Sequence, residues 1–417
     1  MDSSRIKNTK KNIRRIIIGI TAISLAGCVA VLWRNQVSTG TVAFDIDAEQ
    51  TGKIYEAFET SSYDANIRQL SSSGEEIWRT TFGFGSTIVK IQSSSDGLIS
   101  LGQNFTNYTL DKLNSLGQVI WHKDLGVQSY GLADMILLNS ALHISVFTGN
   151  SWDHQVYDLS GNLVKTVESL SQGDLTITKY DASHLLKLRR QYLDPQTMAY
   201  TLEMLGANGD TLWQLPLDYS TVDFTNLNVS SNGDILVSFA SKIFTVNNSG
   251  QLVWQSGALS HVQSAVEDSQ HNLYYVSSTA QTTTLTKLNN THVTLYNVPI
   301  TNAGGSFWRM LFAKNESELV ISYNDSVPIL SGNLRVDTYH TLFLNGTDGA
   351  TLANIAGKSQ TYAPICDGPA GCALGNFVVA GDVFKEIAIN DNKLIVNGQL
   401  GVYPNDGQNF VEAISLP

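Results

Sequence analysis

The stretch Leu205-Gly-Ala-Asn-Gly209-Asp-Thr-Leu-Trp213 decides the fold, because its frame returns along the chain. The frame is an apolar residue, a glycine four positions later and a tryptophan four positions after that. Four of the seven tryptophans stand in complete copies, namely Trp78, Trp121, Trp213 and Trp254. Degenerate copies centre on Gly161, His292 and Gly349, and successive copies lie 41 to 57 residues apart. A unit of this length cannot bury its apolar face alone, so the frame predicts a stack of repeats.

Short aliphatic runs that follow a polar turn form a second periodic signal. Asn232-Gly-Asp234 before Ile235–Phe239 is one example, and such a pair of runs indicates a β-hairpin. The glycine frame is a hairpin too, and two hairpins supply the four strands of one propeller blade. Hairpins of the first kind begin near residues 42, 88, 134, 176, 226, 263, 309 and 383. The sequence therefore predicts an all-β fold, a β-propeller of four-stranded antiparallel blades. Eight blades are favoured, and seven blades with an appended hairpin are the alternative.

The eighth unit lacks its last strand, since it runs out at Phe410–Leu416. We expect the segment around Val37–Thr41 to supply that strand, because closing the ring removes exposed sheet edges. The predicted organisation is a signal peptide or membrane anchor at 1–34, a short tether and possible ring-closing strand at 35–41, and the propeller at 42–417. A Gly- and Pro-containing insertion at 354–382 is a candidate binding loop.

The first 34 residues predict membrane targeting. Six Lys and Arg residues precede an apolar run from Ile16 to Trp33, as in a signal peptide or a membrane anchor with its basic end in the cytoplasm. Within the run, Leu25-Ala-Gly-Cys28 resembles the lipobox of bacterial lipoproteins, which predicts lipidation of Cys28. A plain signal anchor stays the alternative, because the residues after Cys28 are apolar. Both readings place the body outside the cytoplasm, anchored to a membrane in a bacterial periplasm or at the cell surface.

Two further cysteines, Cys366 and Cys372, flank a Gly- and Pro-containing loop within the insertion. In an oxidising envelope this spacing predicts a disulfide that holds the insertion together. A redox pair or half of a metal site are the alternatives, and no further cysteine or paired histidine completes them.

Charge and motif content exclude several classes of function. The chain has 26 Lys and Arg against 37 Asp and Glu, so we expect no nucleic acid as a partner. No phosphate-binding loop, nucleophile elbow or zinc-protease motif occurs, and the eight histidines lack metal-ligand spacing. The best acidic cluster, Asp45-Ile-Asp47-Ala-Glu49 with Glu56 beyond it, departs from a calcium loop at Gln50, where that loop requires glycine. We predict no catalytic residue, cofactor or metal ligand.

The repeats that end at Trp121 and Trp213 resemble the quinoprotein (PQQ-like) propeller repeat, and the resemblance covers residues 42–417. In that family the repeated tryptophan docks between adjacent blades, which implies this structural role for Trp78, Trp121, Trp213 and Trp254. A lipobox-like N-terminus beside a bare propeller resembles the BamB-type outer-membrane assembly lipoproteins, which implies a scaffold. The quinoprotein dehydrogenases of the family carry a vicinal disulfide and a calcium site, and this sequence matches neither.

Two functions stay open. The favoured one is a non-catalytic, membrane-tethered protein-interaction scaffold, a monomer with envelope or membrane proteins as partners. The other is a carbohydrate-binding or quinoprotein-like enzyme that uses the propeller channel, where Trp152 and Trp308 would stack on sugar rings. Acidic residues and histidines that converge at one mouth of the channel would favour the second function. An exposed apolar patch on the loops would favour the first.

Overall fold

The structure, a computed structural model, describes residues 31–39, 42–48, 52–60, 62, 64–128, 133–194, 197–279, 282–301, 307–313, 315–329, 334–356, 360–366, 372–378, 382–390, 393–400 and 408–415. Every regular element within these ranges is a β-strand. Over the same ranges, no helix has the length and apolar character that a membrane crossing needs.

Six sheets each consist of four consecutive antiparallel strands. The first three contain β2 (Val42–Ala48), β3 (Ile54–Glu59), β4 (Asp64–Leu70) and β5 (Glu76–Phe84); β6 (Thr87–Ser94), β7 (Gly97–Gln103), β8 (Asn107–Asn114) and β9 (Val119–Gln128); and β10 (Ala133–Leu138), β11 (Ala141–Phe147), β12 (Trp152–Asp158) and β13 (Leu163–Leu170). The next three contain β14 (Gly173–Lys179), β15 (His184–Asp194), β16 (Thr197–Gly206) and β17 (Thr211–Leu217); β18 (Phe224–Val229), β19 (Ile235–Phe239), β20 (Lys242–Val246) and β21 (Leu252–Gln255); and β22 (Val262–Glu267), β23 (Leu273–Ser278), β24 (Thr283–Leu288) and β25 (Thr294–Thr301).

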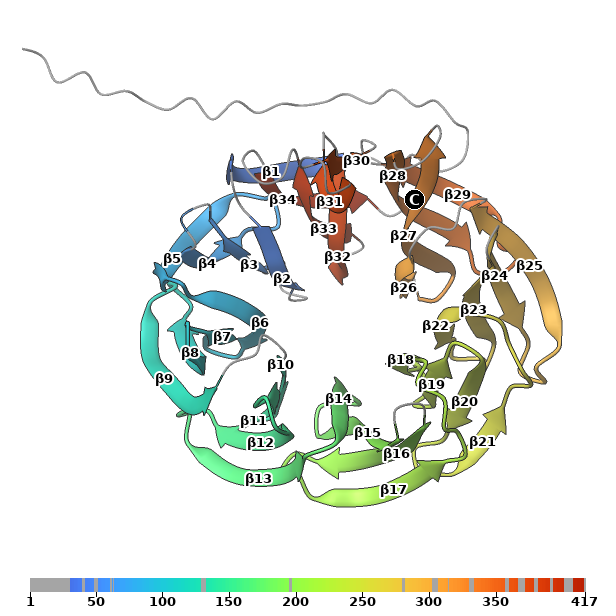
Figure 1. Cartoon of the computed structure of the whole chain (residues 1–417), viewed down its shortest axis with the longest axis horizontal. Coiled ribbons are helices and arrows are strands. Elements are labelled where there is room, and N and C mark those ends of the chain that lie inside the picture. Colours follow the sequence, from blue (N-terminus) through green and yellow to red (C-terminus); the bar gives the residue numbers. More distant parts are fainter. Residues whose placement is uncertain are drawn as a thin grey trace, which may run out of the picture.

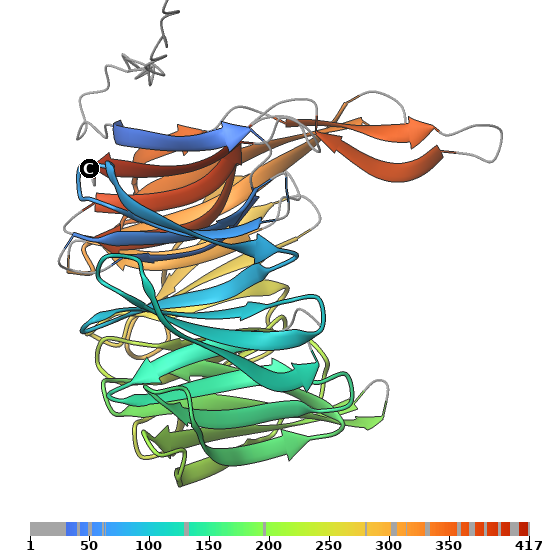
Figure 2. The ribbon, with the colours of Figure 1, turned by 90° about the vertical axis from the view of Figure 1, so that its left-hand side faces the viewer.

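Two sheets near the end of the chain depart from this pattern. One has six strands, β26 (Phe307–Ala313), β27 (Glu318–Ile329), β28 (Leu334–Asn345), β29 (Thr351–Ala356), β30 (Gln360–Cys366) and β31 (Cys372–Val378). Strand β28 pairs with β29 towards its end and with β30 towards its start, so the β30–β31 hairpin lengthens an arm that leaves the ring (Figure 2). The last sheet joins β32 (Asp382–Asn390), β33 (Lys393–Leu400) and β34 (Gln408–Ser415) to β1 (Val31–Thr39), its outermost strand.

The described strands thus form sheets around one axis (Figure 1). The first strand of each sheet is innermost, except in the last sheet, where β32 is innermost and β1 outermost. The prediction of an all-β propeller is confirmed. The innermost strands begin at residues 42, 87, 133, 173, 224, 262, 307 and 382, within three residues of the predicted hairpin starts. Among the described sheets, seven have four strands, a number that matches the seven blades of the alternative prediction. The remaining sheet has six strands. Much of the predicted insertion at 354–382 forms strands β30 and β31.

The N-terminal strand closes the ring by pairing antiparallel with β34, where Arg34 lies opposite Glu412 and Gln36 opposite Phe410. Strand β1 begins at Val31, so the domain boundary drawn at residue 34 falls inside a strand. The physical reason is that Val31, Leu32 and Trp33 suit an edge strand as well as an apolar targeting run. Residues 1–30, including Cys28 and the rest of that run, lie outside the described residues.

Polar side chains on the innermost strands connect one sheet to the next. The Asp45 carboxylate of β2 accepts the Ile91 N–H of β6 at 2.8 Å, and the Gln92 side-chain oxygen of β6 accepts the Leu137 N–H of β10 at 2.5 Å. The Asn228 amide of β18 donates to the Ala265 carbonyl of β22 at 2.6 Å. These bonds satisfy backbone groups that would otherwise be unpaired where the innermost strands meet.

Apolar clusters fill the spaces between neighbouring sheets. The largest aromatic one joins the β14–β17 sheet to the β18–β21 sheet and contains Tyr200, Phe239 and Phe244, all fully buried. The rings of Tyr200 and Phe239 lie 4.8 Å apart in an edge-to-face arrangement. Burying a side chain of this size contributes about 1.5–3 kcal/mol. Because such clusters span two sheets, each sheet is stabilised by its neighbours.

Candidate functional site

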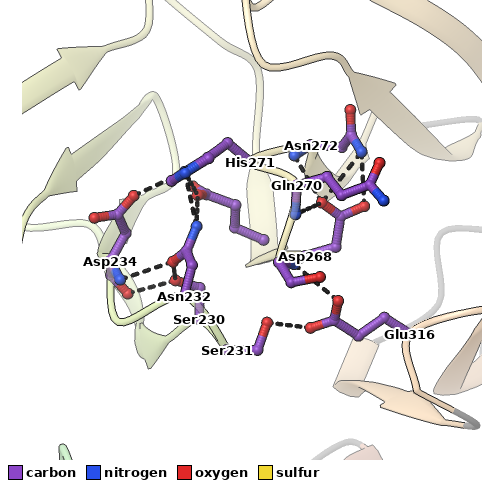
Figure 3. Close-up of polar contacts among 11 residues, drawn as sticks. Ser230, Ser231, Asn232, Asp234, Asp268, Gln270, His271, Asn272 and Glu316 are labelled. Atoms are coloured by element: carbon purple, nitrogen blue, oxygen red, sulfur yellow. Dashed lines mark hydrogen bonds and ion pairs between the residues drawn. The ribbon is translucent and has the colours of Figure 1, made fainter.

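The strongest gathering of polar side chains lies on three successive turns that connect an innermost strand to its neighbour. These turns are 230–234 between β18 and β19, 268–272 between β22 and β23, and 315–317 between β26 and β27. Turns of this kind all open on the same face of a propeller and stand near its axis. Figure 3 shows their side chains directed towards one another.

The first two turns have the same backbone hydrogen bond, but a histidine in the second stands where the first has a glycine. The Gly233 N–H donates to the Ser230 carbonyl at 3.0 Å, and the His271 N–H donates to the Asp268 carbonyl at 3.0 Å. Gly233 has φ 89° and His271 has φ 62°, so the histidine occupies the left-handed position that glycine fills in the preceding turn. The Asp268 carboxylate holds the turn by accepting the Gln270 and Asn272 N–H groups at 3.0 and 2.9 Å.

His271 brings two carboxylates together. Its Nδ1 lies 3.0 Å from a carboxylate oxygen of Asp234, on the neighbouring turn, and 3.0 Å from a carboxylate oxygen of Glu267. The three ligand atoms all lie within 4.8 Å of one another. Glu267 is buried, whereas the His271 side chain is 56% exposed. The cluster therefore has a buried carboxylate at its base and an imidazole open to solvent.

The electrostatics of the cluster favour a positive charge or a proton. Burial raises the pKa of Glu267, and the nearby Asp234 carboxylate raises it further, whereas the neighbouring Asn232 amide and His271 ring lower it. Among the described residues, the ion-pair partner of Asp234 and Glu267 is His271, with no Lys or Arg beside it. A buried carboxylate whose neighbour is a neutral imidazole, with no Lys or Arg, favours taking up a proton or holding a cation.

Glu316, on the third turn, ties that turn to the other two. Its carboxylate accepts the Ser269 N–H at 2.8 Å and the Ser231 hydroxyl through its other oxygen (Figure 3). Partial burial opposes ionisation, but these hydrogen bonds prevail and lower the pKa of Glu316. Glu316 also has a positive φ, 68°, which is uncommon outside glycine. The three turns are thus connected across three sheets through one carboxylate.

Sequence reasoning did not find these residues. Asp234 stands more than thirty positions before Glu267 and His271, and no metal-ligand spacing in the sequence marks the three residues. The available signal was comparative: Asn232-Gly233-Asp234 and Gln270-His271-Asn272 occupy equivalent turns, and a histidine replaces the glycine. That substitution places an imidazole where the preceding turn has no side chain.

The four tryptophans of the repeat lie at the contacts between sheets. The Trp78 ring lies against Gly117 of the next sheet, where an added Cβ would come within 2.5 Å of the indole. Trp121 and Trp213 lie against Gly161 and Gly250 in the same way. The indole nitrogens of the three donate to carbonyl oxygens of the next sheet, on Ser115, Leu159 and Asn248, at 3.1, 3.2 and 3.0 Å.

The degenerate repeats keep this contact with different side chains. Trp254 stacks on His292, with ring centroids 3.9 Å apart and planes 6° from parallel, and His292 has the positive φ of the glycine it replaces. Tyr296, at the tryptophan position, lies against Gly349. Burial lowers the pKa of His292.

The other predicted residues fall in separate places. The register of β30 and β31 sets Cys366 opposite Cys372, and Cys28 lies outside the described residues. In the acidic cluster, Asp45 accepts the Ile91 N–H, Asp47 accepts the Ser93 N–H at 2.5 Å, and buried Glu56 pairs with Arg68 at 2.5 Å, so these carboxylates serve the fold. Trp152 packs beside Phe147, with ring centroids 5.7 Å apart. The side chain of Trp308 lies outside the described residues.

Comparison with known proteins supports the fold. No protein-family model matches the chain, and no curated protein sequence does. The chain is similar to the solved structure of the dihydro-heme d1 dehydrogenase NirN, with a TM-score of 0.53 at 11% identity over 92% of this chain and 78% of that one. It is also similar to the Cps50 (Swd1) β-propeller domain of Myceliophteria thermophila, with a TM-score of 0.48 at 12% identity over 92% and 98% of the two chains. At 11% identity the likeness to NirN concerns the fold alone.

Proposed function

We propose that this chain is a non-catalytic, membrane-tethered, extracytoplasmic β-propeller that binds other proteins as a scaffold. Its binding surface is the face opposite the carboxylate–histidine cluster, where the second and third strands of each sheet are joined. Envelope or membrane proteins are the expected partners.

The observation that carries this proposal is the pair of long hairpins on that face. Strands β15 and β16 have 11 and 10 residues and β27 and β28 have 12 each, whereas the corresponding strands of the other sheets have five to eight. Near the tip of β15, Tyr192 and Leu193 are 42% and 64% exposed. A register shift between Tyr192 and Asp194 marks a bulge at Leu193, a device that redirects a side chain. Exposed apolar groups on projecting hairpins are typical of protein-binding surfaces.

The start of β1 supports a lipid anchor as the tether. Because Val31 already belongs to a strand, the apolar run retains only the 15 residues from Ile16 to Ala30, below the ~17–25 that a spanning helix needs. Cys28 precedes that strand by three residues, which reach at most about 10 Å when extended. Acylation of Cys28 would hold the rim of the propeller close to the membrane surface.

Crosslinked pull-down from intact bacterial envelopes tests the scaffold. The bait is the full chain with its own N-terminus, compared with a Tyr192→Ser, Leu193→Ser double variant. The matched control is Leu212→Ser, because Leu212 is 55% exposed on β17, the outer strand of the same sheet. We expect defined envelope proteins with the wild type and the control, and at least a tenfold lower yield with the double variant. Equal yields from all three baits, or no specific protein from the wild type, would refute the proposal.

A second candidate, binding of a small polar ligand such as a carbohydrate at the channel, is favoured by one observation. Asp234, Glu267 and His271 converge beside the axis on the opposite face. Native mass spectrometry of protein released gently from envelopes tests this function. A bound glycan, retained in the wild type and lost in Asp234→Asn, would favour it over the scaffold.

A further inference from the structure

We propose that Asp234, Glu267 and His271 form a binding site for a divalent transition-metal cation of the Zn²⁺ class. The site joins the β18–β19 turn to the end of β22 and the turn that follows it. The inference concerns the purified chain and does not depend on the scaffold proposal.

The donor set fits such a cation. One imidazole nitrogen and two carboxylate oxygens are ligands that Zn²⁺ accepts at about 2.0–2.2 Å. Donors at that distance from one centre stand roughly 3–4 Å apart. Here Nδ1 of His271 is 3.0 Å from each carboxylate, and all three atoms lie within 4.8 Å. Small side-chain rotations therefore suffice to place the three donors around one ion.

The orientation of Asn232 shows that Nδ1 of His271 presents its lone pair. The Asn232 side-chain oxygen accepts the Asp234 N–H at 2.9 Å and the Ser230 hydroxyl, which fixes the amide nitrogen on the opposite side. That nitrogen lies 2.7 Å from Nδ1 of His271. An amide nitrogen is a donor only, so Nδ1 accepts and carries no proton.

With Nδ1 unprotonated, the imidazole has no hydrogen at this nitrogen to give to the two carboxylates. Two carboxylate oxygens then face a nitrogen lone pair at 3.0 Å, an arrangement that is repulsive unless a proton or a cation lies among the three atoms. On binding, the cation replaces the Asn232 N–H as the partner of Nδ1. That N–H keeps its other acceptor, the Glu267 oxygen at 3.0 Å, and so orients a metal ligand from the second layer.

Exposure and donor chemistry decide what the site accepts. The imidazole is 56% exposed, which provides an entry path and leaves coordination positions for water or an external ligand. A nitrogen donor favours Zn²⁺, Co²⁺ or Ni²⁺ over Ca²⁺, which prefers six to eight oxygens. With three protein donors and open coordination positions, the site has the donor number of catalytic zinc sites, whereas structural zinc sites have four protein donors.

Isothermal titration of the full chain in detergent with ZnCl₂ tests the site, with CaCl₂ as the comparison ion. We expect one equivalent of Zn²⁺, and at least tenfold weaker binding to His271→Gln and Asp234→Asn. The matched control is His184→Gln, because His184 is also a partly exposed histidine paired with an aspartate, Asp181, at 2.8 Å. That variant should bind Zn²⁺ like the wild type.

Cobalt gives an independent readout. One equivalent of Co²⁺ should produce visible d–d absorption bands that Zn²⁺ displaces, and the bands should be lost in His271→Gln. Circular dichroism melting of each variant confirms that it is folded. Absence of Zn²⁺ binding by the wild type, or binding that His271→Gln leaves unchanged, would overturn the proposal.

Discussion

At the scale of single residues, the fold depends on what stands at the turn that receives an aromatic ring. Gly117 and Gly250 receive indole rings at distances that leave no room for a Cβ, and both have positive φ. His292 meets the same demand differently, by accepting a left-handed backbone and stacking its ring on Trp254. The docking position thus tolerates glycine or a flat ring, which is why the repeat degenerates in sequence while the contact persists.

Truncating one docking ring should destabilise the propeller. We expect Trp213→Ala to lower the free energy of unfolding by about 3 kcal/mol, as other large-to-small substitutions at packed aromatic residues do. The adjacent Leu212→Ala, at an exposed position, should change it by no more than about 0.5 kcal/mol. Urea denaturation followed by circular dichroism measures both. Equal effects of the two substitutions would contradict the docking role.

A buried histidine pair predicts a loss of stability in acid. His143 Nε2 lies 2.9 Å from the Ala207 carbonyl and must donate to it, so His143 Nδ1 accepts from His154 Nε2 at 3.0 Å. Burial lowers the pKa of both histidines, that of His154 strongly, and the charges of Lys165 and Lys187 lower the pKa of His154 further. Below pH 6.5, the ordinary pKa of histidine, the unfolded chain therefore binds more protons than the folded chain. The free energy of unfolding accordingly decreases as the pH falls.

The melting temperature at about pH 7.5 and about pH 5.5 tests this linkage. The wild type should lose more stability on acidification than a His143→Gln, His154→Gln double variant. An equal loss in both proteins would show that other groups control the acid response.

At the scale of elements, two hairpins and one strand set this chain apart from a uniform ring. The β30–β31 hairpin pairs with the start of β28 and lengthens the arm, and its register sets Cys366 opposite Cys372. Sequence spacing predicted that these cysteines would meet, but not that strands would carry them, because short Gly- and Pro-containing segments also suit loops.

Peptide mapping under non-reducing conditions tests the predicted disulfide. We expect one peptide pair linked through Cys366 and Cys372 in protein taken from an oxidising envelope. The free energy of unfolding of the Cys366→Ser, Cys372→Ser variant should be lower than that of the wild type by at most about 2 kcal/mol, because the loop that the bond closes is short. Alkylation of both thiols without prior reduction would contradict the prediction.

The strand that closes the ring also bears on the anchor. Because β1 starts at Val31, Cys28→Ser removes the proposed lipid site without touching a described strand. We expect this variant to leave the membrane fraction or to be retained as an unprocessed precursor, whereas the wild type should carry acyl chains detectable by mass spectrometry. A wild type that lacks acylation and stays in the membrane would favour the plain signal anchor.

At the scale of the whole molecule, sequence periodicity predicted the ring well and its sites poorly. The frame around Trp213 and the starts of the hairpins follow from local pattern, since each unit repeats the same turns and strands. Asp234, Glu267 and His271 come together only because adjacent sheets set equivalent turns side by side, which linear spacing does not encode. The exposed tip at Leu193 likewise arises from a bulge and the extra length of one hairpin.

The two faces of the ring therefore have different characters. One carries a carboxylate–histidine cluster beside the axis, and the other carries two long hairpins, of which β15–β16 has the exposed residues Tyr192 and Leu193. The central claim is that the second face binds protein partners. Photocrosslinking in intact envelopes, with a photoreactive phenylalanine analogue at Leu193 or, as the control, at Leu212, tests it most directly. We expect a discrete crosslinked protein band from position 193 and none from position 212. The same bands from both positions, or no band from position 193, would contradict it.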